Sequence, residues 1–416
     1  MILPMLRLVT VLAVSALVAV ACDSDTRSSD NAAVRDTAGV RDVATVVRDS
    51  AGVQIILSDL SDVTSWPACA LSTEPRLRIG RQDADPMLQF FGVEDARRLA
   101  DGRIVVVNRW TQELRVFDTT GAFLSTIGRD GEGPGEFRDP VEVSVLLPDS
   151  LVVWDWGLGR ISVFTSDGTF VRSLLLQPPV LNPTGDFEVL SGDTPLVVAS
   201  HDVRSPRGTE PVLQRLLLLR YDRMGALTDT IAVLPYGVLS RVPGLSRTAV
   251  GRPMFQARGS FTVSGNLILT ANGSDPVIHV WYTNRTLRRV IRWEPPDRGV
   301  SAAEVEEYRR TRLARARSEN ERRSTLRRLD ALPVTDLFPA VREMKTDPAG
   351  YIWVRRYPRP TWENRMWFGF DAGGAFRCAM AVPQRLTVFQ FGPNYVLGKT
   401  VDELGVEYVE LYDLHW

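Results

Sequence analysis

Residues 150–170 read SLVVWDWGLGRISVFTSDGTF, and they repeat the pattern of residues 103–123, RIVVVNRWTQELRVFDTTGAF. Corresponding positions in the two stretches lie 47 residues apart throughout, from 104 and 151 to 123 and 170. A fixed period of this length indicates a repeated structural unit. The matching pairs are Ile104 and Leu151, Asn108 and Asp155, Phe117 and Phe164, Gly121 and Gly168, and Phe123 and Phe170.

Each repeat contains short apolar runs of strand length, separated by turns that carry Asp and Gly. Glycine supplies the positive φ of a tight hairpin, and Asp bonds to its own turn backbone. Four short antiparallel strands every 40–50 residues are typical of a propeller blade. Degraded copies downstream predict an all-β, six-bladed β-propeller, with blades that begin near residues 90, 137, 187, 255, 338 and 386.

The last repeat ends at the C-terminus without its fourth strand, and residues 47–58 supply a spare Asp-x-x-Gly turn with an apolar strand. We therefore expect residues 53–58 to form the outermost strand of the last blade. Joining both ends of the chain in one sheet closes the ring and removes exposed edges. The predicted propeller spans residues 47–416.

The stretch 131–176 resembles an NHL repeat through Phe137, Pro140, Asp155, Arg160 and Gly168. The whole chain is similar to lipid-anchored six-bladed propeller proteins of bacteria. The resemblance implies the fold more firmly than a function, because propellers include enzymes, binding proteins and structural modules.

The N-terminus has the pattern of an export signal. Arg7 precedes an apolar segment from Leu8 to Val20, which is shorter than an ordinary membrane span. Ala19-Val20-Ala21-Cys22 resembles a bacterial lipobox, which implies a signal peptide over residues 1–21 and lipid on Cys22. An ordinary signal peptide cut near Ala21 is the alternative. Residues 22–46 are small, polar and charged, and we expect them to form a tether.

Composition narrows the choice of partners. The formal net charge is -1, so no global field favours nucleic acid. Metal-binding spacings such as CxxC or HExxH do not occur, and no cofactor is predicted. The thiols of Cys69 and Cys378 are expected in an oxidising compartment, where a disulfide and two buried free cysteines are both open.

The glycine-rich stretch GRDGEGPGEF at 128–137 does not have the sequence of a phosphate-binding loop. No Gly-Lys-Ser/Thr follows it, and Asp130, Glu132 and Glu136 would repel a phosphate. Its position between two repeats predicts a joint between blades, with Phe137 buried between them.

Two groups of residues are candidates for ligand binding. Carboxylates of the innermost strands are expected near the central channel: Glu94, Asp95, Glu142 and Glu343. A second group follows the second strands of the first two blades, where it would line one face: Arg109, Trp110, Asp155 and Trp156. No G-x-S-x-G elbow is present, and no catalytic residue is assigned.

Residues 301–332 interrupt the strand pattern with one helical insertion. Ser301 and Glu304 form a capping-box sequence, and nine arginines face five glutamates and Asp330. One interpretation is a solvated helix that packs Val305, Tyr308, Leu326 and Leu329 on the propeller; the other is a docking surface or lid for an acidic partner or ligand.

Together these features predict a monomeric, lipid-anchored protein of the cell envelope. Its membrane contact is the lipid on Cys22, and it acts as a non-catalytic binding or scaffolding module for a protein, peptide or glycan. The alternative is a metal-dependent hydrolase or lactonase of gluconolactonase-like type, with its metal in the channel.

Overall fold

The computed structural model describes residues 43–81, 85–146, 150–180, 183–190, 196–202, 204–206, 210–242 and 249–416. The predicted signal peptide and Cys22 lie outside these residues. No helix of the described part is long and apolar enough to cross a membrane. All described residues belong to one compact unit that begins at Arg41.

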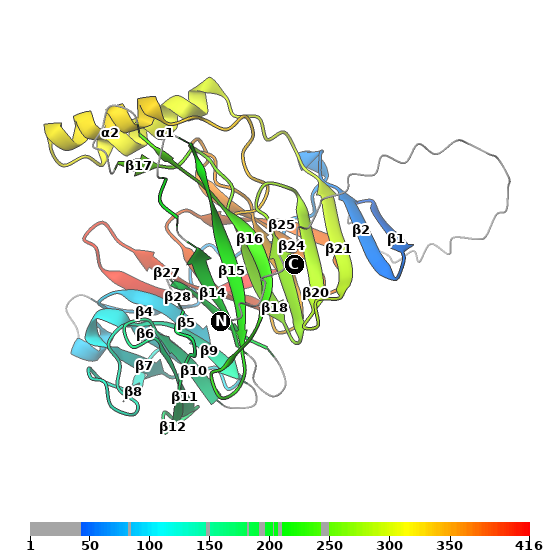
Figure 1. The fold of residues 1–416 in the computed structure, drawn as a ribbon. Coiled ribbons are helices and arrows are strands. Elements are labelled where there is room, and N and C mark those ends of the chain that lie inside the picture. The colour runs from blue at the N-terminus through cyan, green and yellow to red at the C-terminus, as the bar shows by residue number, and fades with distance from the viewer. Residues whose placement is uncertain are drawn as a thin grey trace, which may run out of the picture. The chain divides into compact units, whose positions relative to one another are not determined.

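The strands form six sheets, one for each predicted blade (Figure 1). Blade 1 contains β5 (Val93–Arg98), β6 (Ile104–Asn108), β7 (Glu113–Phe117) and β8 (Phe123–Ile127). Blade 2 contains β9 (Pro140–Leu146), β10 (Ser150–Asp155), β11 (Arg160–Thr165) and β12 (Phe170–Leu175). Blade 3 contains β13 (Pro183–Val189), β14 (Leu196–Asp202), β15 (Val212–Tyr221), β16 (Leu227–Arg241) and the short β17 (Val250–Gly251).

Blade 4 contains β18 (Ser260–Ser264), β19 (Leu267–Ala271), β20 (Val277–Tyr282) and β21 (Leu287–Glu294). Blade 5 contains β22 (Glu343–Thr346), β23 (Ile352–Arg355), β24 (Asn364–Phe370) and β25 (Phe376–Pro383). Blade 6 contains β26 (Thr387–Gly392), β27 (Tyr395–Val401) and β28 (Glu407–His415). Each inner strand begins within five residues of its predicted blade start.

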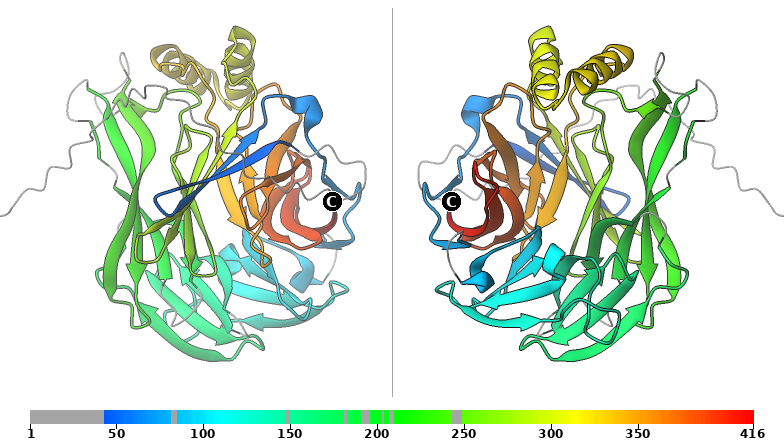
Figure 2. Two further views of the ribbon diagram at one scale, coloured as in Figure 1. Left: turned by 90° about the vertical axis from the view of Figure 1, so that its right-hand side faces the viewer. Right: turned by 90° about the vertical axis from the view of Figure 1, so that its left-hand side faces the viewer.

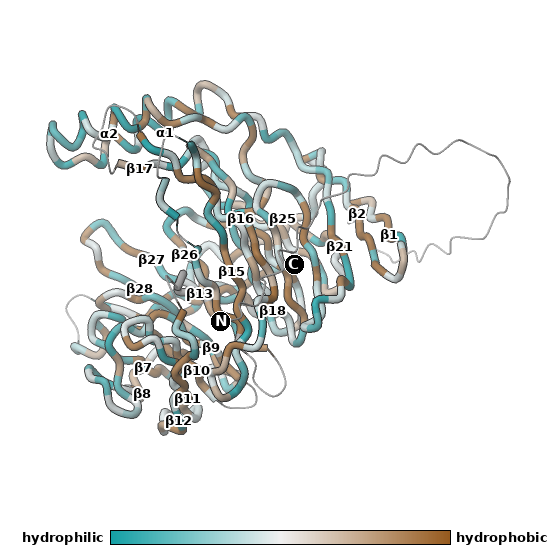
Figure 3. Tube along the Cα trace, viewed as in Figure 1, coloured by the Kyte–Doolittle hydropathy of each residue, from teal (hydrophilic) through white to brown (hydrophobic). Residues whose placement is uncertain are grey.

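The inner strands close a ring. Contacts join β5 to β9, β9 to β13, β13 to β18, β18 to β22, β22 to β26, and β26 back to β5. The fold is therefore the predicted six-bladed β-propeller, closed by a segment that precedes the first blade. Figure 3 shows many hydrophobic residues along the strands, and buried clusters with residues of adjacent blades join blade 1 to blade 2 and blade 2 to blade 3.

The closing segment is not the one predicted. Strand β2 (Val53–Asp59) pairs in parallel with β21 of blade 4, and β1 (Thr45–Ser50) pairs with β2. The fourth position of blade 6 is instead taken by β4 (Leu77–Ile79) and β3 (Ala70–Leu71), which both pair with β28. The prediction that residues 53–58 complete the last blade is therefore wrong. Several strands of suitable composition precede the first blade, and tertiary contacts decide which sheet edge each one covers.

A disulfide joins Cys69 to Cys378, with 5.6 Å between the two Cα atoms. It ties the segment between β2 and β4 to β25 of blade 5. Of the two alternatives that the sequence left open, the paired one is present.

The glycine-rich loop is a joint between blades 1 and 2, as predicted. Phe137 is fully buried in a cluster with residues of both blades. A Cβ on Gly128 would lie 2.2 Å from the Phe137 ring, so glycine is required there. Arg160 donates hydrogen bonds to the carbonyl oxygens of Glu132, Gly133 and Glu136 at 2.6–2.9 Å.

Arg115 binds the carbonyl oxygens of the loop that enters blade 1 in the same way. It donates to the carbonyl oxygens of Pro86, Met87 and Gln89 at 2.6–3.0 Å. Pro86 and Gln89 are 47 residues before Gly133 and Glu136, so the repeat reproduces the bound carbonyls as well as the strands.

The predicted helical insertion forms two helices, α1 (Ala302–Ala314) and α2 (Glu319–Ala331), between blades 4 and 5. The capping box of Ser301 and Glu304 is present. Leu329 is buried, and Val305 and Tyr308 pack against the same cluster, but Leu326 is exposed, contrary to prediction. In Figure 2 both helices lie at one end of the blades.

Candidate functional site

Two neighbouring cavities are candidates for ligand binding. The first, which we call the axial channel, has a volume of about 900 Å³. Its walls come from all six inner strands, which contribute Arg97, Glu142, Glu188, Thr262, Lys345 and Gln390 among others. The inner strands thus supply channel wall on every side of the ring.

Asp95 and Glu142 are held together by Arg97. The Arg97 guanidinium donates to Asp95, and its other terminal nitrogen lies 3.5 Å from Glu142. Asp95 also accepts a hydrogen bond from the Val143 amide at 3.1 Å. Burial raises the pKa of Asp95, and Arg97 and Lys345 oppose that effect. These carboxylates thus join neighbouring inner strands of the ring.

Glu343, on the opposite part of the channel wall, is also paired. Its two carboxylate oxygens lie 2.9 Å from Arg355 and 3.4 Å from Lys345. Burial alone would raise the pKa of Glu343, but these cations, Lys345 first, bring it below its usual value. Asp95, Glu142 and Glu343 therefore lie on inner strands, as predicted, and each is matched by a cation.

Sequence reasoning missed Glu188, another channel residue. It lies on β13 and accepts a hydrogen bond from the Thr262 hydroxyl of β18 at 3.1 Å. The local sequence Phe187-Glu188-Val189 is similar to Val141-Glu142-Val143 on the preceding inner strand. The similarity of these two inner-strand sequences could have predicted that Glu188, like Glu142, lies on the channel wall.

Glu94 does not belong with the channel carboxylates. It is an exposed residue that pairs with Arg109 at 3.1 Å, and it lies at a β-bulge between Val93 and Asp95, where β5 departs from regular pairing with β6. The Arg109 guanidinium also donates bidentate hydrogen bonds to the Asp139 carboxylate, and these hydrogen bonds raise the pKa of Arg109.

The residues predicted to line one face of the first two blades are only partly brought together. The Arg109 guanidinium lies 5.8 Å from the centre of the Trp156 ring. Trp110 is 73% exposed and packs over Gly92. Asp155, however, is fully buried and accepts hydrogen bonds from the amides of Arg138, Asp139 and Leu158 at 2.8–3.1 Å. Its carboxylate holds the loop together and does not face this surface.

The second cavity, which we call the basic chamber, has a volume of about 750 Å³ and lies between blade 3, the loop before β18 and the two helices. It adjoins the axial channel, since Arg258 and Arg342 line both. Six arginines line the chamber: Arg252, Arg258, Arg312, Arg315, Arg328 and Arg342. Only one acidic residue, Glu321, accompanies them.

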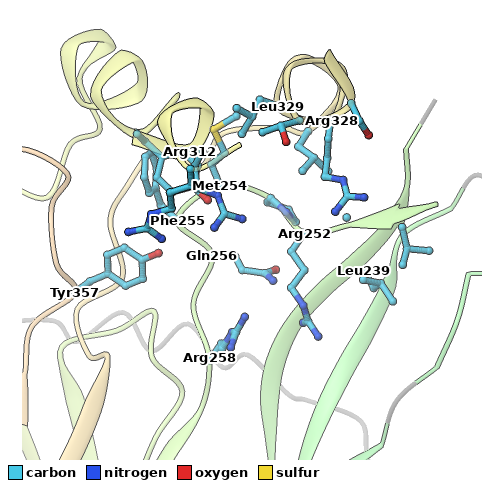
Figure 4. Close-up of a pocket in the computed structure, with 18 of the residues that line it drawn as sticks. Leu239, Arg252, Met254, Phe255, Gln256, Arg258, Arg312, Arg328, Leu329 and Tyr357 are labelled. Atoms are coloured by element: carbon cyan, nitrogen blue, oxygen red, sulfur yellow. The ribbon is translucent and has the colours of Figure 1, made fainter. Parts of the chain in front are cut away.

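Figure 4 shows how these residues lie. Arg252 and Arg258 come from the propeller side of the chamber, as does Gln256, which lies beside Arg252, whereas Arg312 and Arg328 come from the helices. The rings of Tyr308 and Tyr357 each pack on Phe255, which attaches α1 to the propeller. The helices thus bring their arginines close to those of the loop before β18.

The propeller side of the chamber concentrates positive charge around one aromatic ring. The guanidinium carbons of Arg252 and Arg258 lie 5.7 and 5.1 Å from the centre of the Tyr236 ring. Burial, followed by repulsion from Arg258, lowers the pKa of Arg252. The His201 ring packs at a tilt against the Tyr236 ring, with 3.7 Å between the ring centres. Burial, together with the same two arginines, lowers the pKa of His201 to about 4.

Metal binding has no preformed site in the described part of the chain, where no three His, Cys, Asp or Glu residues are arranged to hold an ion. The channel carboxylates accept hydrogen bonds or pair with arginine and lysine instead.

Comparison with known proteins agrees with the fold. Residues 95–174 match a family, DUF5128, described as a 6-bladed beta-propeller. The chain is a six-bladed β-propeller. No significant match was found among the curated proteins.

Solved structures with some similarity are distant from this propeller. A protein described as exported, from Bacteroides fragilis, is 13% identical, with 87% of this chain and 99% of that one covered and a TM-score of 0.47. A member of the duf4221 family from Bacteroides vulgatus is 11% identical, with 83% and 98% covered and a TM-score of 0.47. Virginiamycin B lyase from Staphylococcus aureus is 7% identical, with 84% and 99% covered and a TM-score of 0.39. The activities of such distant proteins do not transfer to this chain.

Proposed function

We propose that this propeller is a lipid-anchored module of the cell envelope that binds a protein, peptide or glycan ligand without transforming it. The export pattern and Cys22 support the location, and the two adjoining cavities support the binding role. Rigid blades that surround a wide polar channel suit recognition, because the channel walls are largely pre-formed.

The observation that carries this proposal is the pairing of the channel charges. Asp95 and Glu142 share Arg97, and Glu343 is held by Arg355 and Lys345. A general acid or base needs a carboxylate that can exchange a proton with a substrate, and these groups are occupied by charged neighbours. The paired charges make the channel a fixed polar surface.

A lactonase-like enzyme is the alternative, with a divalent metal held by channel oxygens. Such a site needs several carboxylate or amide oxygens directed at one point. No specific contact in the described channel favours this arrangement over binding.

The first experiment tests catalysis. The mature chain is incubated with δ-gluconolactone and Ca²⁺, Mn²⁺ or Zn²⁺, and ring opening is followed against the buffer. We expect no acceleration. A rate that rises with protein concentration and is lost in Glu343→Gln, with folding checked by circular dichroism, would establish the enzyme instead.

The second experiment tests binding and location. Glycan and peptide arrays are probed with the mature chain, and mass spectrometry then checks that a bound ligand is recovered unchanged. In cells that process lipoproteins, the full chain should be recovered with membranes, and Cys22→Ala should appear in the soluble envelope fraction. Recovery of both in the soluble fraction would rule out the anchor.

A further inference from the structure

The basic chamber brings together six arginines that form no ion pair with an acid of the described residues. We propose that it binds a ligand that carries two or more oxyanions, either carboxylates or phosphates. The inference rests on the proposed binding function and specifies the chemistry of the ligand. Four observations support it: missing ion pairs, an unmatched donor, the spread of the arginines, and the cavity volume.

None of the six chamber arginines forms an ion pair with an Asp or Glu of the described residues. Other arginines of the same region do: Arg309 pairs with Asp330, Arg310 with Glu307, and Arg359 with Glu304. Acidic partners are thus available on these helices, yet they lie outside the chamber. The like charges that line it repel each other until an anion enters.

The chamber also has a buried donor that lacks an acceptor. The Gln256 side-chain oxygen accepts a hydrogen bond from the Val238 amide at 2.7 Å, which orients the side chain. Its amide nitrogen is buried and has no partner. An unmatched buried donor is unfavourable, and a ligand oxygen would satisfy it.

The one acidic residue does not neutralise the chamber. One Glu321 carboxylate oxygen accepts a hydrogen bond from the Arg317 amide at 2.8 Å, next to the start of α2. Glu321 therefore caps the turn between the helices. It leaves the guanidinium groups of the chamber without a counter-charge.

The spread of the arginines indicates more than one oxyanion. Arg252, Arg258 and Arg342 are half-buried on the propeller side, whereas Arg312, Arg315 and Arg328 are exposed on the helices. A guanidinium binds carboxylate or phosphate through two parallel hydrogen bonds. Since the two sets line different walls of a space of about 750 Å³, a ligand with separated anionic groups can contact both at once.

The test is isothermal titration calorimetry on the mature chain with three probes. Tri-galacturonic acid supplies carboxylates, inositol hexakisphosphate supplies phosphates, and maltotriose is the neutral control. We expect saturable one-to-one binding of at least one anionic probe, weakened at least tenfold between 50 and 300 mM NaCl, and no binding of maltotriose. The stronger anionic probe identifies the class of oxyanion.

Two matched variant pairs distinguish the chamber from general attraction to a basic helix. Arg312→Gln with Arg328→Gln removes two chamber charges and should weaken the anionic probe at least tenfold. Arg322→Gln with Arg327→Gln removes the same charge from exposed positions that do not line the chamber, and it should change affinity less than threefold. Circular dichroism confirms that both variants fold.

The proposal is overturned if neither anionic probe binds, or if the two variant pairs weaken binding equally. Failure of the proposed function would look different: an anionic probe would bind in the chamber and then be recovered chemically altered. Binding of maltotriose alone would overturn the oxyanion proposal and leave the binding function in place.

Discussion

In blades 1 and 2, Arg115 and Arg160 are buried, and each binds three carbonyl oxygens of the loop that enters its own blade. At the helical end, the chamber arginines line a cavity and have no acidic partner among the described residues. Arg252 does donate to the Tyr236 carbonyl oxygen at 3.2 Å, but no acid of the described residues holds any of the six, so their charges remain available to a ligand. A polar residue repeated between blades indicates a role in the fold, whereas one supplied by an irregular insertion is a better candidate for a ligand contact.

The strongest test of the regular region is Phe137→Ala, which removes the side chain buried between blades 1 and 2. Loss of a fully buried Phe leaves a cavity and should lower the free energy of unfolding by about 3–5 kcal/mol. Urea denaturation followed by tryptophan fluorescence measures the change. Trp110→Ala, at a 73% exposed position, should cost less than about 1 kcal/mol. Equal losses would mean that Phe137 does not join the blades.

The next test removes a channel cation. Arg97→Met leaves the buried Asp95 carboxylate without its counter-charge and should lower the free energy of unfolding by about 3 kcal/mol at pH 7. Arg103→Met breaks a more exposed pair with Asp101 and should cost less than about 1 kcal/mol. Denaturation curves of both variants and the original chain measure the difference.

The loss in Arg97→Met should also depend on pH. Burial raises the pKa of Asp95 and Arg97 opposes that rise, so without Arg97 the folded chain takes up a proton at a higher pH than the original does, where the unfolded chain has already lost it. This difference in proton uptake favours folding at low pH, and its contribution disappears as pH rises through the folded-state pKa of Asp95. The variant should therefore approach the original stability on acidification from pH 7 to pH 5. A deficit that grows toward pH 5 would contradict the assigned pairing.

Ring closure gives a third test. Ile79→Ala truncates a buried residue of β4, the strand that completes blade 6, and should lower the free energy of unfolding by about 2–4 kcal/mol. Val47→Ala, on the outer strand β1, changes a mostly exposed side chain and should have little effect. Thermal unfolding compares the two. The reverse order would mean that the first hairpin, and not β4, completes the ring.

Most of the fold could be predicted from local signals. The repeat at 47 residues, the Asp and Gly turns and the capping box at Ser301 located the blades and the insertion, because each depends on residues close in sequence. The closing strand could not be found this way. Strand β4 has only three residues, and its pairing with β28 is decided by contacts between distant parts of the chain.

The candidate site was predictable only in part for the same reason. A place on the inner strands was enough to predict Glu142 and Glu343 on the channel wall. The same reasoning was wrong for Glu94, because a β-bulge between Val93 and Asp95 interrupts the strand there. The basic helices were recognised, but the periodicity did not separate Arg312 and Arg328, which line the chamber, from Arg322 and Arg327, which do not. Arg252, Arg258 and Arg342 have no shared sequence pattern, since tertiary packing alone brings them together.

The smallest expected change in stability belongs to a variant of the chamber, and it tests directly whether the chamber arginines differ from the structural ones. Arg312→Gln with Arg328→Gln should leave the free energy of unfolding within about 0.5 kcal/mol of the original, or raise it slightly, because these exposed side chains pair with no acid of the described residues. Any gain should be larger at 20 mM than at 300 mM NaCl, since salt screens the repulsion that the substitutions relieve. Denaturation at both salt concentrations measures this. A loss comparable to that of Arg97→Met would show that the chamber arginines also stabilise the fold, and the distinction between the two regions would then fail.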